Sequence, residues 1–288
     1  MKYAFYPGCS YSSAAGYKES VDAVIRVLGI RFDEIPDWNC CGATVYPGVS
    51  EKDTMLLGAR VFSLANKNGY LEIITGCNAC YSTLRKVLEK LKADKAFVED
   101  VNRRLSVEGL VFDDNSKIRH VIEVFANDVP EALWTEKITS GHKGTRPGFN
   151  KIKVAPYYGC QLTRPWNDLD PADMLERLIE KVGFTTVDHS AKTMCCGASL
   201  AVPHAKETRP LIKRIIDGAV YNKADIVTTL CPLCQFNLDQ GQAATGTAIP
   251  VTYFSQIIGL ALGLEPEELG LDKLLIRVKK DVLHGRNN

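Results

Sequence analysis

The sequence predicts an α/β protein of two pseudo-symmetric, duplicated halves, each with a small, mostly parallel sheet, flanking helices and a cysteine-rich site at the carboxyl-terminal edge of the strands. Three observations predict it. The 288 residues are about twice the roughly 150 residues of a typical domain. The ten cysteines fall into two sets of five with matched spacing. Segments with strand and helix patterns alternate within each half.

The composition is that of a globular protein. Apolar residues make up 45% and charged residues 24% of the chain, which is enough apolar surface for a sizeable core. The 35 basic and 34 acidic residues leave a net charge of +1, so no overall field favours nucleic acid or an anionic membrane. Polar residues and Pro250 interrupt the longest uncharged stretch, 240–264, and predict a buried helix rather than a membrane span.

The N-terminal apolar run, 3–7, is too short for a secretion signal. We therefore expect a cytoplasmic protein with no nucleic-acid partner and no membrane insertion. Ten cysteines in such a protein indicate metal or redox chemistry rather than a disulfide framework, because cytosolic reductants keep structural thiols reduced.

In the first half, a strand is expected over 3–6, running into Cys9. An amphipathic helix follows, because apolar residues recur at helical spacing in the run Val21, Val24, Ile25 and Leu28. A second strand near 31–35 leads to a double cysteine. A helix over 53–66 then precedes a strand over 71–74, which delivers a Cys-x-x-Cys pair.

The second half repeats this order. A strand over 154–158 runs into Cys160, and a short strand over 185–187 leads to a double cysteine. A helix over 208–222 precedes the strand 225–227, and the first helix is marked by Met174, Leu175, Leu178 and Ile179. Strands joined by helices of this length predict right-handed crossovers and a parallel sheet. All five cysteines of a half should then lie at one sheet edge, where open α/β sheets bind ligands.

The domain boundary is expected near residue 148. Residues 1–148 would form the first domain with an inserted helical region, and 149–288 the second domain with a C-terminal helical tail. The stretch 94–150 lies outside the repeat, and we expect helices at 94–105 and 117–125 followed by a glycine-rich basic loop at 139–153. Partner docking is predicted on this unrepeated stretch. The tail from Glu265 predicts a polar helix and a frayed end.

The cysteine array itself is duplicated. Corresponding cysteines are offset by 151 to 155 residues, and short flanking sequences repeat around them. For example, Cys40-Cys41-Gly-Ala corresponds to Cys195-Cys196-Gly-Ala. The two sets are Cys9, Cys40, Cys41, Cys77 and Cys80, then Cys160, Cys195, Cys196, Cys231 and Cys234. Such repetition indicates an internal duplication.

Thiolates are soft ligands that favour zinc or iron–sulfur clusters, and the Cys-x-x-Cys spacing lets two sulfurs reach one centre. Tetrahedral zinc needs four ligands, so a fifth thiolate in each half would be surplus. Five thiolates fit a cluster whose irons are not all in the simple cubane arrangement, or one cysteine kept for chemistry. Buried structural cysteines, vicinal disulfides and structural zinc are the alternatives. Glycines beside the ligands allow sharp turns and let backbone N–H groups approach sulfur.

With these motifs the chain resembles the tandem cysteine-rich "CCG" domain and, over its length, the family of heterodisulfide reductase B subunits. The resemblance covers about residues 1–260. It implies two noncubane [4Fe-4S] clusters that face each other. By motif position one cluster would be held by Cys9, Cys40, Cys41, Cys77 and Cys80, and the other by Cys160, Cys195, Cys196, Cys231 and Cys234.

The resemblance also implies the reaction and the partners. The chain would be the catalytic subunit that reduces the coenzyme M–coenzyme B heterodisulfide, or an analogue, to two thiols by homolytic cleavage between the clusters. No GxGxxG fingerprint and no ferredoxin-type cysteine set occur in the chain, so electrons must come from elsewhere. The implied donors are the ferredoxin-like C subunit of the reductase and, behind it, its flavoprotein A subunit.

Two other functions remain open. One is an iron–sulfur electron-transfer subunit of a lactate, glycolate or succinate-type oxidoreductase, in which CCG domains also occur. Such chains often carry ferredoxin-type cysteines upstream, whereas Cys9 is the first cysteine here. The other is a non-enzymatic scaffold stabilised by zinc.

The heterodisulfide carries a sulfonate and a phosphate, so fixed cations are expected near the cysteines. Arg164 and Lys192 are the candidate substrate-binding residues. The basic run with Lys143, Arg146, Lys151 and Lys153 is interpreted as a solvated linker. Either His189 or His204 could donate a proton, although a structural role is favoured for both. Trp38 and Met194 are expected to shield the clusters from water. Beyond the cluster ligands, no catalytic residue is predicted.

Overall fold

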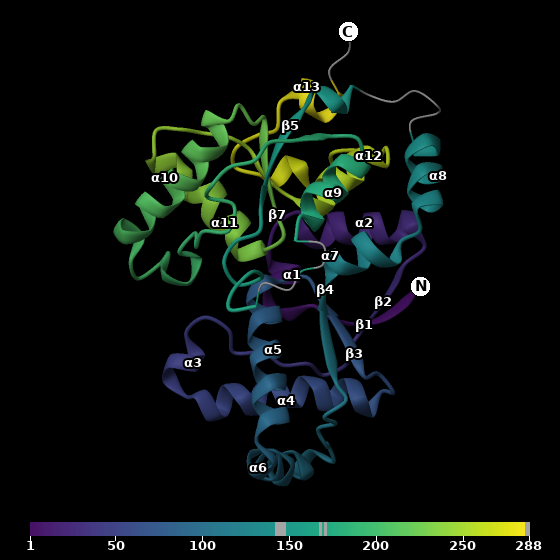
Figure 1. Ribbon diagram of the computed structural model, residues 1–288, viewed down its shortest axis with the longest axis vertical. Coiled ribbons are helices and arrows are strands. Elements are labelled where there is room, and N and C mark those ends of the chain that lie inside the picture. Colours follow the sequence, from purple (N-terminus) through teal and green to yellow (C-terminus); the bar gives the residue numbers. More distant parts are fainter. Residues whose placement is uncertain (142–147, 167–168, 170–171, 286–288) are drawn as a thin grey trace. The chain divides into compact units, whose positions relative to one another are not determined.

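The computed structural model describes residues 1–141, 148–166, 169 and 172–285. It contains two four-stranded sheets in which every pair of neighbouring strands is parallel. The first sheet has the order β2-β1-β3-β4 (Figure 1), and the second has the order β6-β5-β7-β8. The strands are β1 (Lys2–Tyr6), β2 (Arg31–Glu34), β3 (Glu72–Thr75), β4 (Lys117–His120), β5 (Lys153–Tyr157), β6 (Thr185–Thr186), β7 (Ile226–Thr229) and β8 (Val251–Tyr253). The predicted α/β fold of two duplicated halves is confirmed.

Helices connect the strands of the first sheet. Ser50 caps α4 by accepting a hydrogen bond from the Asp53 N–H, and Asp94 caps α6 by accepting one from the Phe97 N–H. α4 and α5 pack against each other and against the sheet. The helices of this stretch are α1 (Gly8–Ser13), α2 (Tyr17–Leu28), α3 (Tyr46–Val49), α4 (Glu51–Lys67), α5 (Asn78–Ala93) and α6 (Lys95–Leu105).

Helices on the crossovers also cover the second sheet. The predicted apolar stripe of α9 is buried, and so is the whole of α12. The helices are α8 (Glu131–Gly141), α9 (Met174–Lys181), α10 (Ala205–Tyr221), α11 (Pro232–Gly241), α12 (Phe254–Ala261) and α13 (Lys280–Leu283). The expectation of a buried helix within 240–264 is met by α12, although β8 precedes it. Within the described residues, no helix is long and apolar enough to cross a bilayer.

The fourth strand of each sheet was not predicted. Residues 117–125 were expected to be helical, but 117–120 form β4, and only then do α7 (Val121–Glu123) and a π-helical turn (Val124–Asp128) follow. β4 pairs with β3, as β8 pairs with β7. Its sequence, Lys-Ile-Arg-His, lacks a clear strand pattern, and the ladder to β3 decides its conformation. The duplication therefore extends into 94–150, which was interpreted as unrepeated.

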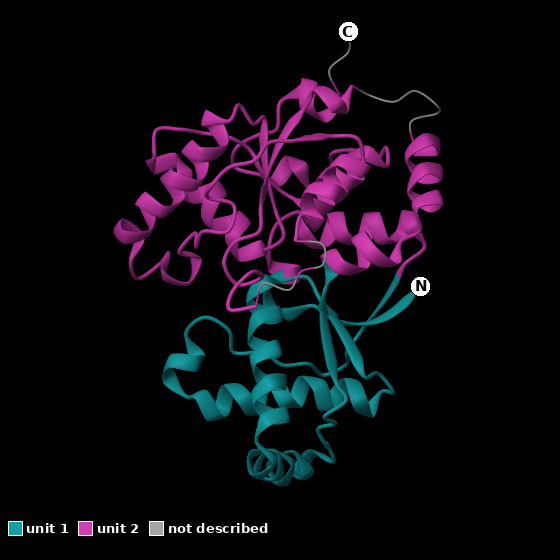
Figure 2. Cartoon of the chain, in the orientation of Figure 1, with its two compact units in different colours: residues 1–10, 31–121 teal, residues 11–30, 122–288 magenta. Residues whose placement is uncertain are grey.

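The chain divides into two compact units, shown in Figure 2. The first contains residues 1–10 and 31–121, and the second contains 11–30 and 122–288. The predicted boundary near residue 148 separates the two sheets but not these units, because α2 and 122–141 belong to the second unit. The reason is the apolar face of α2, which packs on α12.

Three contacts show how α2 is held in the second unit. The Ser20 hydroxyl lies 2.7 Å from the Ser255 hydroxyl. The rings of Tyr17 and Tyr253 are 4.7 Å apart. A β-carbon placed on Gly16 would lie 2.7 Å from the carbonyl oxygen of Gly270. The helix that connects two strands of the first sheet is thus fitted closely into the second unit.

The C-terminal tail is packed rather than frayed. Leu269, Leu271, Leu274 and Val282 are buried. The Asp239 carboxylate accepts hydrogen bonds from the backbone N–H groups of Leu275 and Ile276, at 2.9 and 3.1 Å. The expected polar helix is found only as the short α13, and the expectation of a frayed end was wrong up to residue 285, because buried apolar side chains hold the tail on the second unit.

Candidate metal centres

In the first unit, all five cysteines lie at the carboxyl-terminal edge of the first sheet. Cys9 follows β1 in α1, the double cysteine lies in the loop after β2, and Cys77 follows β3, with Cys80 in the first turn of α5. The chain leaves β1 toward β2 on one side, while β3 lies on the other side, so this is the switch point of the sheet. Cys41, Cys77 and Cys80 are buried, whereas Cys9 and Cys40 are exposed.

The five thiols of the first unit form a continuous row. The Sγ atoms of Cys41 and Cys80 are 3.4 Å apart. Hydrogen bonds also link Cys40 to Cys9 and Cys41, and Cys80 to Cys77. Hydrogen bonds from Cys41 and Cys9 lower the pKa of Cys40 to about 2. These hydrogen bonds favour the thiolate form of Cys40, which is the form that binds metals.

In the second unit, the other five cysteines take the corresponding places. Cys160 follows β5, the double cysteine follows β6 through a loop, Cys231 follows β7, and Cys234 lies in the first turn of α11. The Sγ atoms of Cys196 and Cys234 are 3.5 Å apart. Cys196, Cys231 and Cys234 are buried, Cys160 is half-buried, and Cys195 is exposed.

The thiols of the second unit are linked as a pair and a trio. Cys160 is hydrogen-bonded to Cys195, and Cys234 to both Cys196 and Cys231. The hydrogen bond from Cys160 lowers the pKa of Cys195 to about 6, and the Gly197 N–H and the Arg164 guanidinium act in the same direction. Like Cys40, Cys195 is ready to bind a metal at neutral pH.

A tyrosine at the end of the first strand of each sheet ties down the loop with the double cysteine. The Tyr6 hydroxyl donates a hydrogen bond to the carbonyl oxygen of Asn39, the residue before Cys40, at 2.9 Å. The Tyr157 hydroxyl does the same to Met194, the residue before Cys195, at 2.7 Å. Burial and the nearby cysteines raise the pKa of both tyrosines. These hydroxyls therefore stay protonated and keep donating.

Glycines shape both sites, as the sequence predicted. Gly42 and Gly197, directly after the double cysteines, have φ of +75° and +80°, a region that favours glycine. Their N–H groups donate to the Sγ atoms of Cys40 and Cys195 at 3.4 and 3.3 Å. A β-carbon on Gly8 would lie 2.9 Å from the Sγ of Cys80. The turns at Gly42 and Gly197 thus supply N–H donors to sulfur, and the absence of a side chain at Gly8 leaves space for the sulfur of Cys80.

Sequence reasoning missed three side chains close to the cysteines. Asn237 donates to the carbonyl oxygen of Cys196 at 2.7 Å. His120 ends β4, and burial lowers its pKa to about 4 while Cys77 acts in the opposite direction. Tyr253 takes the corresponding position at the end of β8, where Cys231 contributes to its raised pKa after burial. Recognising β4 and β8 as strands would have placed both residues at the sites.

The two predicted substrate-binding cations differ in their surroundings. The Arg164 side chain is exposed, donates to the carbonyl oxygen of Thr193 at 2.6 Å, and stabilises the thiolate forms of Cys160 and Cys195. Lys192 instead forms ion pairs with Glu176 at 2.9 Å and Asp188 at 2.8 Å. Its charge is therefore largely neutralised within the protein.

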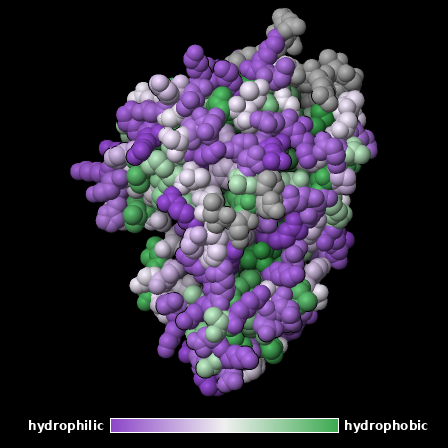
Figure 3. Space-filling view, viewed as in Figure 1, coloured by the Kyte–Doolittle hydropathy of each residue, from purple (hydrophilic) through white to green (hydrophobic). Residues whose placement is uncertain are grey.

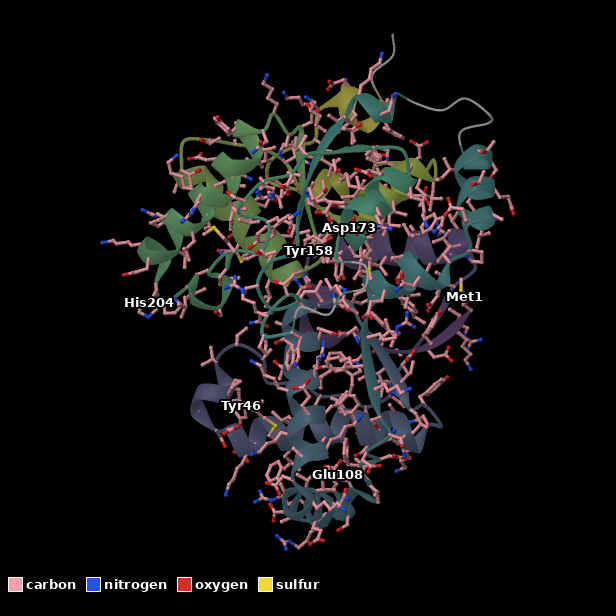
Figure 4. The ribbon with its side chains drawn as sticks, in the orientation of Figure 1. Met1, Tyr46, Glu108, Tyr158, Asp173 and His204 are labelled. Atoms are coloured by element: carbon pink, nitrogen blue, oxygen red, sulfur yellow. The ribbon has the colours of Figure 1, made fainter. Side chains whose placement is uncertain are left out.

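The remaining predicted residues lie as follows. His189 is buried, and its Nε2 donates to the Pro156 carbonyl oxygen at 3.0 Å, whereas His204 lies exposed at the start of α10 (Figure 4). The Trp38 ring packs edge-on against Tyr6, at 5.6 Å between ring centroids. Of the basic run, Lys151 and Lys153 are exposed, and Lys143 and Arg146 lie outside the described residues.

Exposed apolar side chains follow the double cysteine in both halves. In the first half these are Val45 and Val49, 66% and 72% exposed; in the second they are Leu200 and Val202, 50% and 93% exposed. On the face shown in Figure 3, hydrophobic side chains form small patches among hydrophilic ones.

The ligand chemistry of both sites fits a polynuclear metal cluster. All ten cysteines carry thiols rather than disulfides, which argues against the alternative of vicinal disulfides. Among the described residues, no three or more His, Cys, Asp or Glu side chains stand in the arrangement of a metal site. Neighbouring thiols of each half nevertheless lie within hydrogen-bonding distance of one another, and soft sulfur donors of this kind suit an iron–sulfur cluster.

Fold and sites together define a class: a duplicated α/β protein with one cysteine-rich metal centre at the same edge of each sheet. The family model described as "Cysteine-rich domain" (CCG) matches residues 3–85 and 154–239, which is more than half of the chain. The chain therefore belongs to the CCG cysteine-rich domain family, in its tandem form.

Relatives match over nearly their full length. A protein named 8-methylmenaquinol:fumarate reductase membrane anchor subunit, from Wolinella succinogenes, is 32% identical, with 97% of this chain and 98% of that protein covered. The B subunit of ferredoxin:CoB-CoM heterodisulfide reductase from Methanosarcina mazei is 30% identical, with 94% and 93% covered. The chain is thus a member of the group that includes heterodisulfide reductase B subunits, and an iron–sulfur subunit of an oxidoreductase complex.

A solved structure supports the fold. The crystal structure of a hypothetical protein from Helicobacter pylori matches with a TM-score of 0.72 and 14% identity. The match covers 96% of this chain and 52% of that one. At this identity the likeness concerns the fold alone.

Proposed function

We propose that this chain is the catalytic subunit of a heterodisulfide reductase-type complex. It reduces a small-molecule disulfide, the coenzyme M–coenzyme B heterodisulfide or an analogue, to two thiols by homolytic cleavage between two noncubane [4Fe-4S] clusters. The disulfide bond breaks, each sulfur gains one electron and then one proton, and two electrons are consumed in total. The relatives named as B subunits of heterodisulfide reductases support this reaction class.

One observation carries the proposal: in each half, three of the five thiols are buried and the other two are exposed or half-buried. In the first half, Cys77 and Cys80 are among the buried thiols and Cys9 is exposed. A cluster bound by such a set would be embedded in protein on one side and open to a small molecule on the other. A centre that only transfers electrons needs no opening of this kind.

The ligands would be the five cysteines of each half. When bound, the clusters supply one-electron chemistry and iron sites with affinity for thiolate sulfur. The chain holds the ligand loops in place through Tyr6 and Tyr157, and donates N–H hydrogen bonds to sulfur from Gly42 and Gly197. These contacts orient the thiolates and stabilise their negative charge.

Arg164 is the candidate that positions an anionic group of the substrate. Its side chain is exposed beside Cys160 and Cys195, and its guanidinium can bind a sulfonate or phosphate through two parallel hydrogen bonds. Lys192 has less to offer, because Glu176 and Asp188 already neutralise it.

Electrons would reach the chain from the ferredoxin-like C subunit of such a complex, with the flavoprotein A subunit behind it. The exposed apolar residues after each double cysteine, Val49 in the first unit and Val202 in the second, lie close along the chain to the exposed cysteines, and each unit would use them for docking. We propose that the whole complex works in the cytoplasm.

A second function is favoured by one observation. The relative from Wolinella succinogenes is named as a subunit of a fumarate reductase, which corresponds to the succinate-type alternative. In that case the two clusters would pass electrons between partner subunits and would not bind a substrate disulfide.

Anaerobic purification with the partner subunits, followed by metal analysis and spectroscopy, tests the proposal. Two four-iron clusters predict about eight irons and as much acid-labile sulfide per chain. Oxidising the protein with candidate thiols should produce a thiol-dependent paramagnetic signal. Iron and sulfide without such a signal would support the electron-transfer function, and zinc without sulfide would support the scaffold.

A further inference from the structure

Two threonine hydroxyls at corresponding positions of the two halves are buried without a partner. Thr75 ends β3 and Thr229 ends β7, and both residues are 0% exposed. Neither Oγ1 atom has a hydrogen-bond partner among the described residues. Buried hydroxyls are nearly always hydrogen-bonded, and each exception needs a reason. Because the same unpaired hydroxyl occurs at the same place in both halves, we expect the two hydroxyls to have the same structural reason.

The strand register places both hydroxyl-bearing side chains on the face that looks toward the cysteines. Thr75 lies directly opposite Tyr6, and Thr229 lies directly opposite Tyr157. Residues paired in this way point to the same side of a sheet. The two tyrosines are the residues that hold the double-cysteine loops and are influenced by the cysteines of their own half.

The cysteines that follow the two threonines also indicate that the threonine side chains face the cysteine site. Cys77 and Cys231 come two residues after Thr75 and Thr229, and both have extended backbone, with φ near −121° and −126°. In extended chain, residues two apart lie on one side. Each threonine therefore shares its side with the first cysteine of the Cys-x-x-Cys pair.

A neighbouring threonine shows that the strand itself does not leave hydroxyls unpaired. Thr228, one residue before Thr229, is also 0% exposed, and its hydroxyl donates to the carbonyl oxygen of Thr252 at 3.4 Å. It lies on the opposite face of the sheet. Of the two, only the threonine on the cysteine side lacks a partner among the described residues.

We propose that the hydroxyls of Thr75 and Thr229 donate O–H···S hydrogen bonds to the iron–sulfur cluster of their own half. This inference rests on the proposed clusters, and it assigns their buried side two donors in addition to the N–H groups of Gly42 and Gly197. Reduction adds negative charge to a cluster, and a hydrogen bond to its sulfur stabilises that charge. The two threonines therefore raise the reduction potentials.

The test replaces each hydroxyl with a methyl group of nearly the same size in the anaerobically purified complex. Thr75→Val and Thr229→Val should each lower the potential of one cluster, measured by redox titration with paramagnetic resonance detection. A tenfold change in the reduction equilibrium constant corresponds to about 59 mV for a one-electron step, and we expect a shift of that order. Thr228→Val is the matched control and should leave both potentials unchanged.

A spectroscopic readout separates hydrogen bonding from a general change in structure. The Fe–S vibrations of the wild-type protein should shift in D2O, and part of that shift should disappear in both valine variants. Thr75→Ser and Thr229→Ser keep the hydroxyl and should show the full isotope shift of the wild-type protein. They also provide a comparison with the wild-type protein if a valine variant fails to bind iron. Iron-loaded valine variants with wild-type potentials and isotope shifts would overturn the inference. Absence of iron and sulfide from the wild-type protein would instead overturn the proposed function.

Discussion

The two cysteine sites share their ligands but not their surroundings. Both have five cysteines, a tyrosine that anchors the loop and a glycine N–H that donates to sulfur. At the end of the fourth strand, however, the first site has His120 and the second has Tyr253. Four residues after the first cysteine, the first half has Ser13 and the second has Arg164.

The side-chain contacts next to the Cys-x-x-Cys pairs also differ between the two halves. In the first half, the ring of Tyr81 meets His120 edge-on, with 6.0 Å between ring centroids. In the second, Gln235 takes the place of Tyr81 and accepts a hydrogen bond from the Tyr253 hydroxyl at 3.0 Å. The two halves thus share the cysteines that would bind the metal, but they differ in the side chains around those cysteines. Arg164 stabilises thiolates of the second site, whereas Ser13 at the corresponding position carries no charge. We therefore expect the two sites to contribute differently to the reaction.

The largest effect should come from removing one buried ligand in either half. Cys80→Ser and Cys234→Ser each remove a buried thiol that is hydrogen-bonded to two other cysteines of its half. Each variant should lose one cluster and keep the other, so iron should fall from about eight to about four per chain, and disulfide reduction should be abolished. The two variants are each other's control. Loss of all the iron from both would show that the halves do not bind metal independently.

A second comparison uses the glycines after the double cysteines. Alanine in the left-handed conformation costs about 1–2 kcal/mol, and this applies to both Gly42→Ala and Gly197→Ala. At Gly197 the new methyl would also lie 2.7 Å from Thr208 Cγ2, whereas at Gly42 the nearest contact is 3.4 Å. Crowding of this kind adds about 1–3 kcal/mol. Thermal unfolding should therefore show a larger loss for Gly197→Ala, and equal losses would contradict the stated geometry.

Substrate affinity should depend on the second half. Arg164→Gln removes the exposed cation beside Cys195 and should raise the KM for an anionic disulfide about tenfold, because a charge-assisted hydrogen bond contributes about 1.5 kcal/mol. Lys192→Met serves as the control and should leave the KM nearly unchanged, since Lys192 is paired with two carboxylates. The opposite pattern in steady-state kinetics would assign the anion to Lys192.

The smallest effect concerns pH and His189. Burial lowers the pKa of this histidine, and its Nδ1 has no partner among the described residues. The folded protein therefore resists protonation that the unfolded chain accepts below its pKa of about 6.5. Stability is fully present above that pH and falls as the pH drops below it. The pH dependence of unfolding should flatten in His189→Gln but not in His204→Gln, which changes an exposed residue.

The sequence predicted the parts of the fold that depend on apolar periodicity and the parts of the site that depend on cysteine spacing. The parallel sheets and most of the expected helices were found, and the cysteines of each half lie together. β4 was missed because Lys117–His120 is a polar edge strand formed through its ladder with β3. His120 and Tyr253 were missed with the fourth strands, since only the register places them beside the cysteines.

The ion pairs of Lys192 also lay beyond sequence reasoning. They depend on the distance of its amino group from Glu176 and Asp188, and Glu176 is 16 residues away along the chain. Spacing indicates which residues reach a common edge, but it does not show which charges are already neutralised there.

The membership of α2 in the second unit has a consequence for any attempt to cut the chain in two. A fragment ending near residue 148 would keep both strands that α2 connects but would lose α12, the helix on which α2 packs. The apolar face of α2 would then be exposed to water, and the fragment would tend to aggregate. During synthesis, α2 should therefore reach its final packing only after α12 has been made.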